Sequence, residues 1–220
     1  MSLTLYYHPL SSFCHKVLIA LYEHGIAFEK RIIDLSNAAE RAELEALWPL
    51  CKFPVIRDHD RQRNVPESSV IIEYLDQLYV GQHQLIPDDW DIALQVRLWD
   101  RFFDCHVQQP MQQIVADRIH ATHGDLSKQR AALLTAYGVI ERQLHETGWV
   151  ASPNFSMADC SAVPALFYAR TLVPFPDDCP RVSAYFERLI QRPSVQGIID
   201  EARPWFDWYP FAEALEARFR

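Results

Sequence analysis

Short segments that alternate between hydrophobic and polar positions are interleaved with segments of helical period over residues 1–79. Alternation predicts strands and the longer period predicts helices, because side chains repeat every 2 residues in a strand and every 3.6 in a helix. The predicted order is strand 3–7, helix 12–24, strand 27–33, helix 38–47, strand 54–57, a strand closing at 65–66, and helix 68–79. In the last helix we expect the buried face to carry Val70, Ile71, Tyr74, Leu75 and Leu78. This mixture predicts a small α/β domain.

The rest of the chain is helical in pattern. Segment 80–89 lacks periodicity and contains Gly81 and Pro87, so it is the expected linker. Helices are predicted over 92–119, 127–146, 156–170, 181–191 and 194–202. Ser156 and Asp159 have the spacing of a capping box, which is a structural signal for a helix start. The expected organisation is an α/β domain over 1–79, a linker over 80–89 and an all-helical domain over 90–220.

Charge and composition narrow the classes of protein. The formal net charge of −8 disfavours binding to nucleic acid or to an anionic membrane surface. The five cysteines are odd in number, widely spaced and without a C-x-x-C pair, which is typical of a reduced, cytoplasmic protein. The first residues enter a strand directly, with no signal-peptide pattern, and no stretch of 18 residues is apolar. We therefore expect a cytoplasmic protein.

Three motifs carry candidate chemistry. Pro9 ends the first strand because it has no N–H, and Ser11 and Ser12, both N-cap types, precede the helical pattern. Lys52-Phe53-Pro54-Val55 places a proline at a strand start, and Glu67-Ser68 opens a helix. A helix start offers free N–H groups and a positive dipole end, so it suits an anion or a thiolate.

These motifs, in this order and in a chain of this length, resemble the glutathione transferase family. The resemblance implies a thioredoxin-like N-terminal domain and a helical C-terminal domain that contributes the electrophile pocket. The stretch His8-Pro9-Leu10-Ser11, with Lys16-Val17 beyond it, is similar to the serine-type phi and zeta classes. Ser11 would then be the catalytic residue that donates a hydrogen bond to the glutathione thiolate. Ser12 stays a second candidate for that hydroxyl.

The same resemblance assigns the binding of glutathione, the expected co-substrate. Pro54 would form a cis bond whose Phe53 backbone pairs with the cysteinyl backbone of glutathione. Ser68 would bind the γ-glutamyl carboxylate and Glu67 the ammonium, while Lys52 would reach the glycyl carboxylate. No residue of the second helix matches the family's binder of the glycyl end. No metal is expected, because His120 and His123 lack further ligands. We expect a solvated helix end capped by Gly124 there instead.

The expected function is transfer of glutathione to a small hydrophobic electrophile by a homodimer. The warrant for the dimer is the apolar bulk of Trp99, Phe102 and Phe103 on one helix. The alternatives are a glutathione-dependent isomerase or dehalogenase, and a non-catalytic glutathione-binding or regulatory protein. A thiol-disulfide oxidoreductase is disfavoured because position 11 is serine. If neither serine stabilises the thiolate, Tyr6 or Tyr7 is the next candidate.

Overall fold

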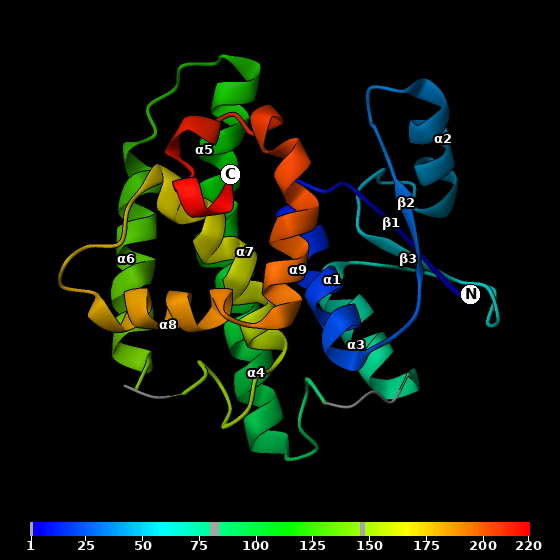
Figure 1. Ribbon diagram of the computed structural model, residues 1–220, viewed down its shortest axis with the longest axis horizontal. Coiled ribbons are helices and arrows are strands. Elements are labelled where there is room, and N and C mark those ends of the chain that lie inside the picture. The colour runs from blue at the N-terminus through cyan, green and yellow to red at the C-terminus, as the bar shows by residue number, and fades with distance from the viewer. Residues whose placement is uncertain (1, 80–83, 146–147) are drawn as a thin grey trace. The chain divides into compact units, whose positions relative to one another are not determined.

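A computed structural model describes residues 2–79, 84–145 and 148–220 of the chain (Figure 1). The chain divides into two compact units, Met1–Ile86 and Pro87–Arg220. The division falls inside segment 80–89, of which residues 80–83 lie outside the described residues.

The first unit is a four-stranded mixed sheet with three helices. Its elements are β1 (Leu3–Tyr7), α1 (Ser12–His24), β2 (Glu29–Ile32), α2 (Ala38–Leu47), β3 (Val55–Asp58), β4 (Arg63–Pro66) and α3 (Ser68–Leu78). The strand order is β2-β1-β3-β4, in which β1 is parallel to β2 and antiparallel to β3, and β3 is antiparallel to β4. This is the α/β domain that the alternation predicts.

The sheet of this unit lies between α2 on one side and the neighbouring pair α1 and α3 on the other (Figure 1). α1 ends at Gly25, whose φ of 66° is left-handed and favours glycine. On α3 the expected buried face is only partly correct. Ile71 and Leu75 are buried, but Val70 is 54% exposed and Leu78 is 42% exposed. Ile72 takes the buried position instead, so the apolar stripe is rotated from the predicted one.

A buried carboxylate at the end of β3 connects the sheet to α3. Asp58, at the end of β3, accepts hydrogen bonds from the hydroxyls of Tyr74 and Tyr79 and from the backbone and guanidinium of Arg61. Burial alone would raise the pKa of Asp58, but these donors outweigh it and lower the pKa to about 2. The native state therefore binds the Asp58 proton more weakly than the unfolded chain does.

This difference predicts a pH-dependent contribution to stability. Asp58 should stabilise the fold by roughly 2 kcal/mol above about pH 5, and the contribution should disappear as the pH falls through about 2. Urea denaturation gives the unfolding free energy of the wild type and of Asp58→Asn at each pH between neutral and 2. The difference between the two proteins measures the contribution of Asp58, because the other carboxylates contribute equally to both. A difference in unfolding free energy that stays constant over this range would contradict the assignment.

The second unit contains helices and no strand among its described residues. Its helices are α4 (Trp90–Phe102), a π-helical stretch (Phe103–Gln108), α5 (Gln109–His120), α6 (Ser127–Gln143), α7 (Met157–Leu172), α8 (Pro180–Ile190) and α9 (Pro193–Ala202), followed by short 3-10 turns. α7 is almost wholly buried and packs against α4, the π-helical stretch, α5 and α8. The predicted capping box is confirmed, with Ser156 and Asp159 bonded to each other's backbone at the start of α7.

Three expectations for this unit are corrected. α5 ends at His120 and is capped by Ala121, whose φ is 49°, and not by Gly124. α6 ends at Gln143, before the predicted end at residue 146, which lies outside the described residues. Trp99 and Phe103 are buried within their own unit, where their rings and that of Phe102 contact one another. They are therefore core residues and give no support to a dimer.

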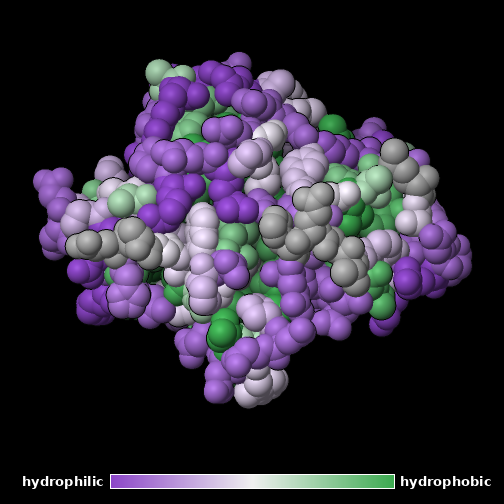
Figure 2. Space-filling model, turned by 60° about the horizontal axis from the view of Figure 1, so that its bottom comes forward, coloured by the Kyte–Doolittle hydropathy of each residue, from purple (hydrophilic) through white to green (hydrophobic). Residues whose placement is uncertain are grey.

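The surface gives no sign of a membrane-spanning segment. None of the helices in the described part of the chain is long and apolar enough to cross a bilayer. On the face drawn in Figure 2, hydrophilic residues predominate and hydrophobic ones form small, separate areas.

Candidate functional site

The register of the sheet brings the three sequence motifs to one edge. Tyr6 in β1 lies opposite Val55 in β3, and Val55 lies opposite Pro66 in β4. Because the neighbouring strands are antiparallel, the end of β1, the start of β3 and the end of β4 lie at the same edge. The Ser11 loop, the Phe53-Pro54 loop and the start of α3 leave the sheet at these three points.

Ser11 is the N-cap of α1. Its φ of −77° and ψ of 118° are extended, and its Oγ accepts a hydrogen bond from Cys14 N at 3.4 Å. A serine hydroxyl that accepts a hydrogen bond can also donate its own hydrogen. The backbone N–H groups of Ser12 and Phe13 have no acceptor among the described residues. The start of α1 therefore presents several donors at the positive end of the helix dipole.

Ser12 and Cys14 differ from Ser11 in exposure. Ser12 is the first residue of α1 and is only 6% exposed, whereas Ser11 is partly exposed. Cys14 is fully buried, and burial raises its pKa to about 12 despite the hydrogen bond from Ser11. The expectation that Cys14 is a small buried apolar residue is confirmed, because a thiol with this pKa stays protonated.

The loop before α1 is held by two histidines that the sequence did not single out. His15 Nε2 donates to the carbonyl of Pro9 at 2.5 Å, and His8 Nδ1 accepts from Leu10 N at 3.2 Å. Burial lowers the pKa of His8, which the Asp34 carboxylate offsets in part. A neutral His8 with its proton on Nε2 fits the accepting role of Nδ1. These contacts fix the backbone that carries Ser11.

The Phe53–Pro54 peptide bond is cis, as the resemblance implies. The Phe53 ring stacks on the His8 ring, with centroids 6.0 Å apart and an interplanar angle of 19°. The N–H and C=O of Phe53 have no backbone partner within the described chain. Phe53 therefore offers a free donor and acceptor beside the Ser11 loop.

Glu67 and Ser68 begin α3 at this same edge. Glu67 has a φ of 69°, which is uncommon outside glycine, and its exposed carboxylate makes no capping bond to the helix. Ser68 is the first residue of α3 and is 7% exposed. Left-handed residues of this kind cluster at ligand sites, and here the conformation turns the chain from β4 into α3.

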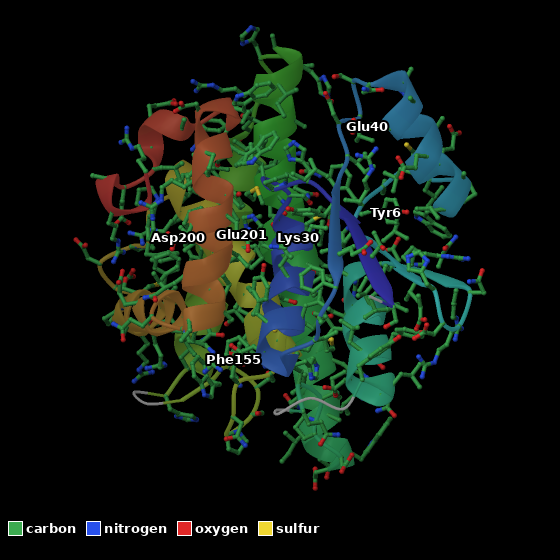
Figure 3. The ribbon with its side chains drawn as sticks, turned by 45° about the vertical axis from the view of Figure 1, so that its right-hand side comes forward. Tyr6, Lys30, Glu40, Phe155, Asp200 and Glu201 are labelled. Carbon is green, nitrogen blue, oxygen red and sulfur yellow. The ribbon has the colours of Figure 1, made fainter. Side chains whose placement is uncertain are left out.

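Two predicted residues are less firmly placed. Lys52 is exposed and makes no hydrogen bond or ion pair within the described residues, so nothing in the fold positions its ammonium. Tyr6 lies on the α2 side of the sheet, where it packs against the cluster Ile33, Leu44 and Val55 (Figure 3). Burial raises the pKa of Tyr6, and Glu43 adds to this. Its side chain is therefore a packing residue of the α2 face.

Sequence reasoning gave no role to Lys16, which follows the Ser11 motif on α1. Its side chain is fully buried, and its Nζ donates to Ser69 Oγ in the first turn of α3 at 2.8 Å. This bond joins the two helices whose starts form the candidate site. A search of the described residues finds no group of three or more His, Cys, Asp or Glu side chains that could hold a metal.

Family models match both units. The model of the glutathione S-transferase N-terminal domain matches residues 5–83, and that of the C-terminal domain matches residues 106–188. Among curated proteins, the chain is similar to glutathione S-transferase F6 of Arabidopsis thaliana, with 26% identity over 87% of this chain and 96% of the relative. It is also similar to a stringent starvation protein A homolog of Haemophilus influenzae, with 25% identity over 92% of each chain.

Solved structures of glutathione transferases have a fold similar to that of this chain. A glutathione S-transferase of Methylobacterium radiotolerans, in complex with glutathione sulfonate, has a TM-score of 0.77 and 25% identity over 89% of this chain and 93% of that one. A delta-class glutathione transferase of Nilaparvata lugens has a TM-score of 0.84 at 19% identity, over 96% and 99% of the two chains. The two domains of one family are thus matched in order along the chain. The chain belongs to the glutathione S-transferase family.

Proposed function

We propose that this protein is a serine-type glutathione transferase, similar to the phi and zeta classes, that transfers glutathione to a small hydrophobic electrophile. Ser11 donates its hydroxyl hydrogen to the thiolate, and the start of α1 supplies further positive potential. Phe53 binds the cysteinyl backbone, Ser68 the γ-glutamyl carboxylate and Glu67 the ammonium. Lys52 is the candidate for the glycyl carboxylate. Ser12 is the second candidate hydroxyl.

The observation that carries this proposal is the meeting of three polar features at one edge of the sheet. These are the Ser11 hydroxyl at the start of α1, the Phe53 backbone, whose N–H and C=O have no backbone partner within the described chain, and the start of α3 at Glu67 and Ser68. Glutathione has a thiol, a cysteinyl peptide backbone and a γ-glutamyl carboxylate. Each group of the peptide therefore finds a partner of complementary chemistry.

Turnover decides between catalysis and binding alone. We expect the purified protein to conjugate glutathione to a generic aromatic halide, as followed by absorbance. Glutathione binding by calorimetry without any turnover would favour a non-catalytic protein. That second candidate is supported by the similarity to a protein named for stringent starvation and not for transfer. Turnover only with an isomerisable or halogenated substrate would favour an isomerase or a dehalogenase.

Substitution of Glu67 tests the binding assignment. Glu67→Gln keeps the shape of the side chain and removes its charge, so the glutathione ammonium loses a charged partner. We expect the binding free energy to weaken by roughly 1–3 kcal/mol, the value of a hydrogen bond to a charged group. Calorimetric titration with glutathione measures it, and Glu29→Gln on the exposed edge strand β2 is the matched control. An unchanged Kd in Glu67→Gln would remove this residue from the site.

We infer that the protein is a cytoplasmic homodimer, as is typical of its family. The residues that support a dimer are not the ones that the sequence suggested. On α4 an exposed apolar stripe is formed by Trp90, Leu94 and Leu98, which are 70%, 48% and 55% exposed. Their spacing of four residues places them on one helix face. Phe102, four residues beyond Leu98, lines a groove of about 550 Å³ together with Pro110 and neighbouring residues.

A charge in this stripe is expected to separate the subunits. Light scattering at micromolar concentration should give twice the chain mass of 25.6 kDa for the wild type and a single chain mass for Leu98→Glu. The reason is that a buried, unpaired carboxylate costs several kcal/mol. Trp208→Glu, at a residue that is 76% exposed outside the stripe, should stay dimeric. A monomeric wild type would refute the dimer, and a dimeric Leu98→Glu would refute the interface.

A further inference from the structure

Lys16 occupies a position that packing alone does not favour. Lysine is almost never fully buried, yet this side chain has no exposed surface. Its ammonium contacts Ser69 Oγ at 2.8 Å, in the first turn of α3. A helix start has a positive partial charge, so a cation there opposes the helix dipole.

An anion bound at the start of α3 would turn this repulsion between the Lys16 ammonium and the helix dipole into a shared attraction for the anion. The ammonium of Lys16, the dipole of α3 and the N–H groups of its first turn all attract negative charge. The side chain reaches this turn from α1 and contacts Ser69, the residue next to Ser68. The hydrogen bond to Ser69 also fixes the turn on which Ser68 sits. Lys16 can therefore act on a ligand carboxylate without touching it.

We propose that Lys16 is a positioning residue for the γ-glutamyl carboxylate of glutathione. This inference rests on the proposed function of the site. Lys16 holds the first turn of α3 through Ser69 and adds buried positive charge behind it. Ser68 and the helix N–H groups make the direct contacts with the carboxylate. Lys16 thus differs from Lys52, which is exposed and would contact the ligand itself.

A comparison of two ligands isolates this role. The ligands are glutathione and its analogue in which the γ-glutamyl α-carboxylate is an uncharged carboxamide. In Lys16→Met we expect the Kd for glutathione to rise about tenfold and the Kd for the analogue to change less than about twofold. Ser69→Ala, which removes the hydrogen bond and keeps the charge, should give a smaller loss with the same preference. Lys128→Met, at an exposed lysine near the start of α6, should bind both ligands like the wild type.

The outcomes separate the inference from the proposed function. Equal losses for the two ligands in Lys16→Met would mean that Lys16 only stabilises the fold, and would overturn the inference. Unchanged affinity for glutathione would overturn it as well. If Lys16→Met does not fold, Ser69→Ala decides by the same comparison of ligands. A wild type that binds neither ligand would instead refute the proposed function, and the inference would fall with it.

Discussion

Replacement of Asp159 by alanine is expected to lower the free energy of unfolding by roughly 3–5 kcal/mol, because several buried donors lose their only acceptor. Asp159 is fully buried at the start of α7. It accepts hydrogen bonds from Ser156 N at 2.9 Å, Ser156 Oγ at 2.8 Å, Val150 N at 3.3 Å and the Tyr185 hydroxyl at 2.5 Å. Burial raises the pKa of this carboxyl, although all four hydrogen bonds favour its ionised form.

Chemical denaturation of Asp159→Ala followed by circular dichroism measures this loss. Asp177→Ala is the matched control, because Asp177 is exposed in the loop before α8. The control should change the unfolding free energy by less than about 0.5 kcal/mol. If Asp159→Ala is as mild as the control, the four hydrogen bonds do not hold the start of α7.

Replacement of Ser11 by alanine is expected to reduce turnover near neutral pH by roughly ten- to a hundredfold. The hydrogen bond from a serine hydroxyl to a charged acceptor is worth roughly 1.5–3 kcal/mol, and its loss raises the pKa of the bound thiol by about one to two units. Turnover should recover in part at high pH, where the thiol ionises without help. Affinity for glutathione should change far less, because most of the contacts lie at Phe53, Glu67 and Ser68.

The Ser11 substitution also removes a helix cap. The bond from Cys14 N to Ser11 Oγ is long, at 3.4 Å, so its loss should cost no more than about 1 kcal/mol of stability. Ser12→Ala is the control for catalysis, since Ser12 is buried at the first position of the same helix. A large loss of turnover in Ser12→Ala with a normal Ser11→Ala would assign the hydroxyl to Ser12.

The sequence predicted a helix boundary correctly where the residues that cap the helix lie close together in the sequence. The start of α1 at Ser11 and its end at Gly25 follow from residue types that fit those conformations, and so does the Ser156–Asp159 box. At the end of α5 the same reasoning chose Gly124 and was wrong. There Ala121 takes the left-handed conformation, while Gly124 N donates to Asp117 in the loop that follows.

Features that depend on distant parts of the chain were not predictable in this way. The alternation of the strands does not specify that β1 pairs with β3, and this pairing brings the Ser11 loop beside Phe53. Nor does the sequence reveal that Lys16 is buried, because its ammonium meets a residue 53 positions away. The orientation of α3 is likewise set by its packing on α1, which exposes Val70 and buries Ile72.

The pKa of the bound thiol tests the central claim most directly. The ultraviolet absorbance of the thiolate, titrated against pH in the complex of the wild type with glutathione, gives this value. The proposed site predicts a pKa about two units below that of free glutathione, since the Ser11 bond and the start of α1 together supply the required 2.7 kcal/mol or so. A bound thiol that titrates like free glutathione would contradict thiolate activation by this site.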